Sequence, residues 1–397
     1  MSSRVGPPQD EAELEQFAAI LSESLSFPLR SETDFLTRYC TADMRLIHRS
    51  GRVVGGLTLL PCGQFFGGQR VPMVGVHAVA IAPEARGSGA GHELCAAAVG
   101  ELAGEGGPPI AVLYPATQPV YRGVGFEQAG SFTRYRMPVA AIPAGPHDLP
   151  VERVDSDAGA AAAALGAVYG RVARRQNGFV DRTTWFWRRA VDPLKQSVST
   201  YCVRESGAVT GYLVLGRTWD MRSHPHTQLT CRELVADTPG AARRLWTLLA
   251  DERSLARTLV ITGPPAAPDH LLFAEQTAEV EWQLRWMLRL LDVEAALTAR
   301  GYAEGVARVV ALEVEDDLIA RNRDRFTVEV AGRRAHVRRG ADGAPVRISV
   351  RGLAALYSGY QSAEQLAGVG LADGEREALA ALTTIFSGPA PWLAEMF

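Results

Sequence analysis

The stretch AVAIAPEARGSGAGHELCAAAVGEL, residues 78–102, joins an apolar run to a helical pattern through one arginine and three glycines, namely Arg86, Gly87, Gly89 and Gly91. The first backbone N–H groups of a helix have no partners inside the helix, so a glycine-rich turn that enters a helix commonly receives an anion. The spacing therefore predicts an anion site, and several cofactors carry a suitable anion.

Two common nucleotide-binding loops do not fit this stretch. The dinucleotide fingerprint G-x-G-x-x-G needs a third glycine and an acidic residue about 20 positions further on. His92 stands where the third glycine belongs, and the next strand-like stretch, IAVLYPA, ends without an acid. A phosphate-binding loop of the G-K-S/T type is excluded too, because no lysine follows the glycines.

A second signal follows in TQPVYRGVGFEQAG, residues 117–130, where Tyr121 lies four positions before Gly125 and Phe126. The order Arg86-x-x-Gly89-x-Gly91, strand, Y-x-x-x-G-F resembles the GNAT acetyltransferase superfamily. The resemblance implies acetyl-CoA as co-substrate and no metal, with backbone N–H groups and Arg86 on the pyrophosphate. The cofactor-binding residues that it implies are Val79, Ala80, Ile81, Arg86, Gly87, Ser88, Gly89, Ala90, Gly91, His92, Ala116 and Thr117.

Composition narrows the class of protein. With 397 residues the chain is expected to form two or three domains, and 47% hydrophobic residues suffice for packed cores. The 41 basic and 44 acidic residues nearly balance, which argues against a nucleic-acid partner held by a basic field. The five cysteines are scattered, and no signal sequence or membrane span is recognisable, so we expect a cytoplasmic protein with free thiols.

The elements that must position these residues can be read from hydrophobic periodicity. Strands with a hairpin turn at Ser50–Gly51 precede the loop, and strands joined at Gly207 occur again in the second third of the chain. A strand and an amphipathic helix follow at 229–254, without the arginine-and-glycine loop, which indicates a degenerate repeat. In the last third, residues 325–350 are expected to form two strands joined by an Asp-Gly turn, followed by helices.

This three-part layout resembles the Eis (enhanced intracellular survival) family of N-acetyltransferases. Besides the loop and VYRGVGF, the resemblance is carried by 168–189, by 286–302 and by the tail SGPAPWLAEMF. It implies an α/β (α+β) chain with tandem GNAT-like domains on mixed central sheets and a C-terminal sterol-carrier-like domain. The expected divisions are an active domain at 1–146, a degenerate GNAT-like domain at 147–285 and the sterol-carrier-like domain at 286–397, in a homohexamer by family analogy.

The family mechanism transfers to two residues of this sequence. The resemblance implies that Tyr121 is the general acid that returns a proton to the CoA thiolate. It also implies that the terminal α-carboxylate of Phe397 is the general base on the acceptor amine, while the ring anchors the chain end. The apolar neighbours Trp392, Leu393 and Met396 favour a docked rather than a frayed terminus.

The acceptor stays open at this stage. A primary amine is expected, either on an aminoglycoside-like polyamine or on a lysine side chain. A polycation needs carboxylates to meet it, and Glu395, Asp34 and the aromatic Phe35 are the candidates in sequence. The alternatives are a non-catalytic carrier of apolar ligands, or acyl transfer with a different acyl donor or to a hydroxyl group.

Overall fold

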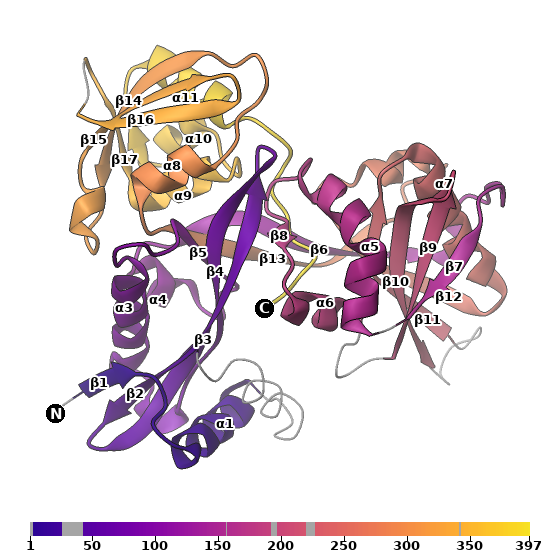
Figure 1. The fold of residues 1–397 in the computed structure, drawn as a ribbon, viewed down its shortest axis with the longest axis horizontal. Helices are drawn as coiled ribbons and strands as arrows, with labels where there is room; N and C mark the ends of the chain where they lie inside the picture. The colour runs from indigo at the N-terminus through magenta and orange to yellow at the C-terminus, as the bar shows by residue number, and fades with distance from the viewer. Residues whose placement is uncertain (1–2, 26–42, 156, 192–196, 220–226, 341–342) are drawn as a thin grey trace. The chain divides into compact units, whose positions relative to one another are not determined.

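A computed structural model of the 397-residue chain describes residues 3–25, 43–155, 157–191, 197–219, 227–340 and 343–397. The chain divides into two compact units (Figure 1). The first comprises residues 1–130, 285–388 and Phe397, and the second comprises residues 131–284 and 389–396. Helices and strands alternate in both, so the mixed α/β class is as predicted.

The first unit contains a sheet in the order β1-β2-β3-β4-β5-β13. Its strands are β1 Ser3–Gly6, β2 Met44–Arg49, β3 Arg52–Phe66, β4 Gln69–Ile81, β5 Ile110–Leu113 and β13 Glu279–Leu290, which enters this unit at Arg285. All neighbours run antiparallel except β4 and β5, which are parallel. The turn between β2 and β3 has φ of 51° at Ser50 and 77° at Gly51, which confirms the predicted hairpin.

Within the described residues, the helices that accompany this sheet are α1 Glu11–Leu25, α3 Ala90–Leu102 and α4 Gln118–Arg122. Leu94, Cys95, Ala98 and Val99 lie at helical spacing on α3 and are all buried. They pack in one apolar cluster with residues of β3, β4, β5 and α4. This packing fixes the start of α3, and therefore the loop before it, against the ends of the strands.

The remainder of the first unit is a smaller sheet in the order β16-β15-β14-β17-β18. Its strands are β14 Arg308–Glu315, β15 Arg325–Ala331, β16 Arg334–Arg339, β17 Val346–Ser349 and β18 Ala372–Asp373, and its helices are α8 Val293–Ala299, α9 Val350–Tyr357, α10 Ala363–Gly368 and α11 Arg376–Phe386. The expectation of two strands is wrong, because the described residues of 325–349 form three strands. The predicted Asp-Gly turn includes Asp342, which lies outside the described residues. The turn between β15 and β16 is Gly332–Arg333 with φ of 54° and 65°, and an arginine gives little sequence signal for that conformation.

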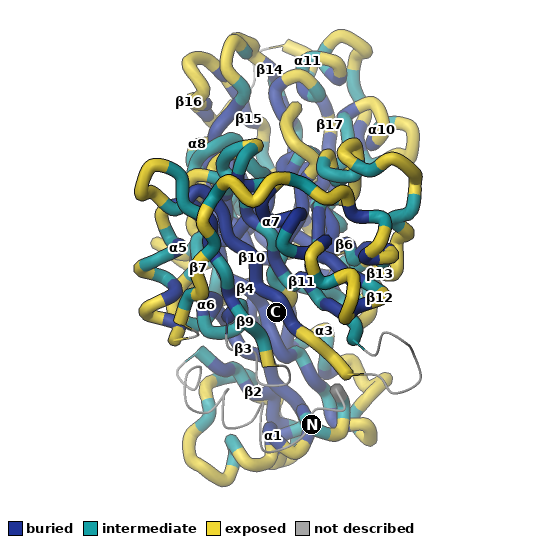
Figure 2. Tube along the Cα trace, turned by 90° about the vertical axis from the view of Figure 1, so that its right-hand side faces the viewer, coloured by how far each residue is buried: buried dark blue, intermediate teal, exposed yellow. Residues whose placement is uncertain are grey.

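The second unit is built from β6, β7, β9–β12 and three helices, with the sheet order β6-β12-β11-β10-β9-β7. The bounds are β6 Glu127–Pro138 (in this unit from Ser131), β7 Val151–Val154, β8 Val180–Asp181, β9 Val198–Glu205, β10 Ala208–Trp219, β11 Thr227–Ala236, β12 Ala256–Gly263, α5 Ala158–Ala173, α6 Thr184–Val191 and α7 Pro239–Asp251. The turn at Gly207 and the strand-to-helix order at 229–254 are confirmed. Figure 2 shows that buried residues follow the central strands, such as β10 here and β4 in the first unit.

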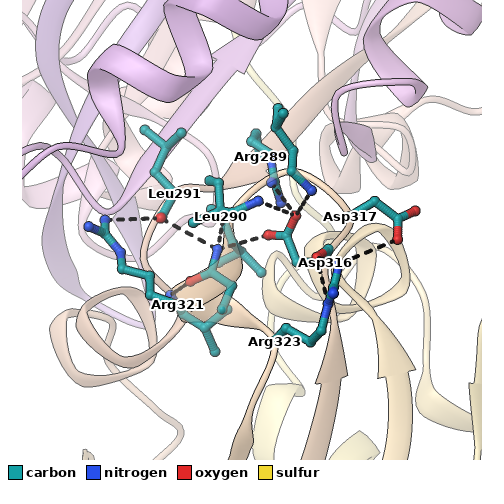
Figure 3. Close-up of polar contacts among 11 residues, drawn as sticks. Arg289, Leu290, Leu291, Asp316, Asp317, Arg321 and Arg323 are labelled. Atoms are coloured by element: carbon teal, nitrogen blue, oxygen red, sulfur yellow. Dashed lines mark hydrogen bonds and ion pairs between the residues drawn. The ribbon is translucent and has the colours of Figure 1, made fainter.

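A buried ion pair joins β13 to the segment after β14 (Figure 3). The Arg289 Nη2 donates to Asp316 Oδ1 at 2.7 Å, and at most 1% of either side chain is exposed. Asp316 also accepts hydrogen bonds from the Asn322 amide and from the backbone N–H of Ile319. Burial raises the pKa of Asp316, but the hydrogen bond and charge of Arg289 outweigh burial and leave that pKa below its usual value.

The same arginine explains a glycine of the sequence motif. Gly125 has φ of +87°, and a Cβ atom placed there would lie 2.7 Å from the Arg289 Cζ. The guanidinium therefore packs directly against the turn between Tyr121 and Phe126. Gly125 is required both by its backbone conformation and by this close approach.

We expect Asp316→Ala to lower the free energy of unfolding by about 3–5 kcal/mol, because it leaves the buried Arg289 charge without its partner. Asp317→Ala is the matched control, since the Asp317 side chain is fully exposed and lies 3.9 Å from Arg323. Thermal denaturation of both variants measures the difference. Equal melting temperatures would show that the buried pair contributes nothing.

Candidate active site

The loop predicted to bind an anion runs from the end of β4 to the first turn of α3. Gly87 and Gly89 have φ of 75° and 85°, and Gly89 caps α3 without any side-chain hydrogen bond. Non-glycine residues rarely adopt this conformation, so the two glycines are required by the backbone. The first-turn N–H groups of α3 therefore stay available to an anion, which the positive end of the helix dipole also attracts.

Gly91 differs from the other two loop glycines. A Cβ atom there would make only ordinary contacts, 3.6 Å from an Ile81 carbon and 3.9 Å from Val120. The protein's own packing thus does not require glycine at this position. A missing side chain at the first helical turn leaves room for a ligand to approach the backbone closely.

The chain itself holds the loop in shape. The Arg49 guanidinium donates to the Ser88 carbonyl at 3.1 Å and pairs with Glu93 at 3.1 Å. The Ser88 hydroxyl donates to the Ala85 carbonyl at 2.5 Å. Arg86 itself is exposed, and its Nε lies 3.4 Å from the Ile81 carbonyl. Arg49 is a supporting residue that sequence reasoning missed, because it lies on β2, far from the loop along the chain.

The strands β4 and β5 part next to this loop. Their parallel register runs through Met73–Ile110 and Val74–Ala111 to Gly75–Val112, although β4 continues to Ile81 within the described range 43–155. On its other side β4 carries a bulge, with Ala78 at φ of 53°, where Ala78 and Val79 lie opposite Leu57 of β3. Successive residues of a strand direct their backbone groups to opposite edges, so Val79 and Ile81 present theirs on the β5 side, whereas Ala80 pairs with Gly56 of β3. The Ile81 carbonyl accepts a hydrogen bond from the Ser24 hydroxyl at 3.1 Å.

Tyr121 lies on α4 and is 5% exposed, in the apolar cluster with Cys95, Val76 and Leu113. Burial, and to a smaller extent Cys95, raise its pKa well above the usual value. No hydrogen bond joins its hydroxyl to any residue in the described ranges. The group is thus protonated at neutral pH.

Phe397 is 7% exposed and packs on the other face of the same two strands. Its ring lies edge-on to Tyr114, with centroids 5.9 Å apart, and a Cβ atom on Gly75 would meet it at 2.7 Å. Gly75 and Tyr114 are sequence neighbours of Val76 and Leu113, and successive strand residues point to opposite faces. Tyr121 and Phe397 therefore lie on opposite faces of the sheet where β4 and β5 part.

The remaining candidates lie around this opening or outside the described residues. Ala116, Thr117 and His92 are exposed, and Thr117 is the N-cap residue of α4. His92 lies against Gly123, where a Cβ atom would be 3.1 Å from its Nδ1. Asp34 and Phe35 fall outside the described residues. No cluster of three metal-ligating side chains occurs among the residues that were placed, and none of the described helices is long and apolar enough to cross a membrane.

The segment before Phe397 is fixed within the second unit. The Leu393 N–H donates to the Ser131 carbonyl at 3.0 Å, and Trp392 packs edge-on against Phe179 with centroids 4.8 Å apart. Arg182, whose side chain is 2% exposed, pairs with Glu395 at 2.6 Å and with Glu233 at 2.5 Å. Glu395 is thus committed to an internal ion pair. Arg182 and Glu233 were not predicted, because their meeting depends on tertiary packing.

The loop in the second unit that corresponds by order, between β11 and α7, is built differently. The Thr238 side chain caps α7 by accepting from the Ala241 N–H, and Pro239 at the first turn has no N–H. The carboxylate of Asp237 lies just before them, where Arg171 pairs with it at 2.6 Å. These residues replace the donors of an anion site with a carboxylate, a hydroxyl cap and a proline.

Known protein families and structures match this chain over nearly its whole length. The "Acetyltransferase (GNAT) domain" family matches residues 178–290 and again residues 7–129, and "Sterol carrier protein domain" matches residues 293–394. An "Uncharacterized N-acetyltransferase" of Streptomyces griseus is 30% identical over 99% of this chain and 94% of its own length. A GCN5-related N-acetyltransferase from Anabaena variabilis superposes with a TM-score of 0.94 at 32% identity over the whole of both chains.

Eis1 from Mycobacterium abscessus has a TM-score of 0.80 at 26% identity over 99% of this chain and 100% of its own. The fold and loop define an acetyltransferase of the GNAT superfamily, with tandem GNAT domains and a sterol-carrier-like domain, as predicted. The chain belongs to the family of N-acetyltransferases that includes the Eis proteins.

Proposed function

We propose that this acetyltransferase moves the acetyl group of acetyl-CoA directly to a primary amine at the opening between β4 and β5. The observation that carries the proposal is the combination of an uncapped helix start on α3 with a parting of two parallel strands beside it. An anion and an extended arm can bind these two features together. GNAT domains also imply the use of acetyl-CoA.

The hydrogen-bond donors of the loop suit the pyrophosphate of an acyl-CoA. The N–H groups from Gly87 to His92 and the exposed Arg86 bind the pyrophosphate, and Gly91 leaves the space for it. The backbone groups of Val79 and Ile81 pair with the amide-bearing arm as an added strand would, and Ala80 lies between them along the arm. Ala116 and Thr117 flank the far side of the opening, before α4.

Tyr121 acts as general acid in this proposal. When the amine nitrogen bonds to the acetyl carbon, the carbon–sulfur bond breaks and the leaving thiolate takes the phenol proton. The raised pKa of Tyr121 keeps that proton in place at neutral pH until the thiolate forms. The absence of a competing protein acceptor among the described residues leaves the hydroxyl free to turn toward sulfur.

The terminal carboxylate of Phe397 acts as general base from the other face of the strands. An α-carboxyl group has a pKa of about 3.3–3.7, so it is ionised at neutral pH and can accept a proton from the acceptor ammonium, directly or through water. The ring contacts with Tyr114 and Gly75 hold it in register. Acid and base on opposite faces suit a reaction in which the nucleophile enters on one side and the thiolate leaves on the other.

The three-domain division at 1–146, 147–285 and 286–397 and the homohexamer belong to the same proposal. Size-exclusion chromatography with light scattering tests the oligomer. A cytoplasmic location stays a prediction.

The test of the reaction is mass spectrometry of products after incubation with acetyl-CoA and single acceptors. The acceptors are a lysine-containing peptide, an aminoglycoside and an alkylamine, with the matching alcohol as control. We expect acetylation of at least one amine and none of the alcohol. If acetyl-CoA binds and only the alcohol is acetylated, amine transfer is wrong and the hydroxyl alternative is right.

Tyr121→Phe should lower kcat about 100-fold or more, because the proton donor is lost while the ring still fills its site. The dissociation constant for acetyl-CoA should stay unchanged by calorimetry. Tyr135→Phe, which removes a hydroxyl bonded to the Pro264 carbonyl in the second unit, is the control and should keep kcat. An unchanged kcat in Tyr121→Phe would remove this residue from the mechanism.

Two glycines added after Phe397 should abolish turnover without changing the melting temperature, because they move the carboxylate and leave an amide in its place. The same two residues added at the N-terminus are the control. A C-terminally extended enzyme with full kcat would rule out the terminal carboxylate as base.

A further inference from the structure

The second unit contains a cavity of about 400 Å³ with an unusual lining. Phe132, Phe186 and Trp282 form an apolar wall, in which Phe132 and Trp282 stack edge-on with centroids 5.5 Å apart. Guanidinium groups supply most of the charge, from the residues Arg134, Arg182, Arg189 and Arg232. The carboxylates in the lining are Glu233 and Glu395.

Secondary structure directs these side chains to one place. Phe132 and Arg134 lie two apart on β6 and therefore on one face, and Phe186 and Arg189 lie three apart on α6 and share a helix face. Arg232 is the extra residue of a bulge in β11, because Val214 pairs with Glu233 and Leu215 pairs with Cys231. A bulge turns a side chain out of the regular alternation, here into the cavity.

Arg232 is a partly buried cation among like charges. Burial lowers its pKa, Arg189 and Arg134 lower it further, and Glu233 only partly opposes them. Its guanidinium donates to the Arg189 backbone carbonyl at 3.3 Å. A charge held in this way is costly unless an anion joins it.

The carboxylates of the lining are committed to another arginine. Arg182 binds Glu233 and Glu395 together, and it lies over the Tyr169 ring with its Cζ 4.1 Å from the centroid. Glu281, 3.4 Å from Arg134, is also shared with Arg136. Burial and the neighbouring Glu395 raise the pKa of Glu233, and the charge of Arg182 opposes that rise only in part. The residues that line the cavity thus carry four guanidinium groups against two carboxylates.

We propose that this cavity binds a small organic anion, with a carboxylate on Arg232 and its neighbours and an apolar body against Phe132, Phe186 and Trp282. The volume lies in the range of small-molecule sites. Guanidinium groups bind carboxylates through paired, charge-assisted hydrogen bonds. The same charges repel a polycation, so an aminoglycoside is not a ligand of this cavity. The proposal concerns binding alone and does not depend on the acetyl-transfer mechanism.

Calorimetry on the full-length chain tests it with three probes of one shape, which are 3-phenylpropionate, 3-phenylpropan-1-ol and 3-phenylpropylamine. We expect the carboxylate to bind about tenfold or more tightly than the alcohol, because it forms charge-assisted hydrogen bonds with the guanidinium groups, and the amine to bind most weakly. Equal affinities, or a preference for the amine, would overturn the proposal. Inorganic phosphate binding as tightly as the carboxylate would overturn the role of the apolar wall.

Arg232→Met keeps most of the side-chain volume and removes the charge, so it should weaken 3-phenylpropionate about tenfold or more and leave the alcohol unchanged. Arg153→Met is the matched control, because Arg153 is exposed on β7 of the same unit. If Arg232→Met does not fold, Arg134→Met replaces it with the same expectation. Full affinity for the carboxylate in the folded variant would contradict the site.

Discussion

The parting of β4 from β5 after Gly75 and Val112 is the constraint on which the candidate active site depends. Parallel strands normally satisfy each other's backbone groups along their length. Here the bulge at Ala78 and the loop after Ile81 turn β4 away, and donors and acceptors of the strand become available. Groups on either face of the sheet can reach the opening between the two strands. The start of α3 at Ala90, Tyr121 and Phe397 all lie around this opening.

Each unit contains a buried arginine that joins segments far apart in the sequence. In the first unit Arg289 pairs with Asp316 and packs against Gly125, so one guanidinium connects the sterol-carrier-like part to the turn behind Tyr121. In the second unit Arg182 joins Glu233 to Glu395 and fixes the segment that leads to the chain end. Each ion pair is nearly inaccessible to water, where loss of one partner is costly. These ion pairs fix the backbone next to Tyr121 and the segment before Phe397.

The two GNAT-like sheets show how one architecture diverges in function. The first keeps glycines with positive φ before its helix, whereas the second has Asp237, a hydroxyl cap and Pro239 at the corresponding place. Both carry a bulge in the strand before that helix, at Ala78 and at Arg232. In the first unit the bulge exposes backbone groups, and in the second it turns a guanidinium into a cavity. The second sheet thus retains the local geometry with different side chains on it.

The sequence by itself determined most of the order of strands and helices, the glycine-rich turn at residues 86–91 and the resemblance to the family, because these depend on local periodicity and on glycine conformations. It failed at 325–349, where the turn uses Arg333 in a conformation that arginine seldom adopts. Only the tertiary structure decided that Glu395 pairs with Arg182, 213 residues away. The basic character of the cavity likewise comes from β6, α6 and β11 meeting in space. Such contacts depend on packing between distant segments, for which no residue pattern in the chain gives a signal.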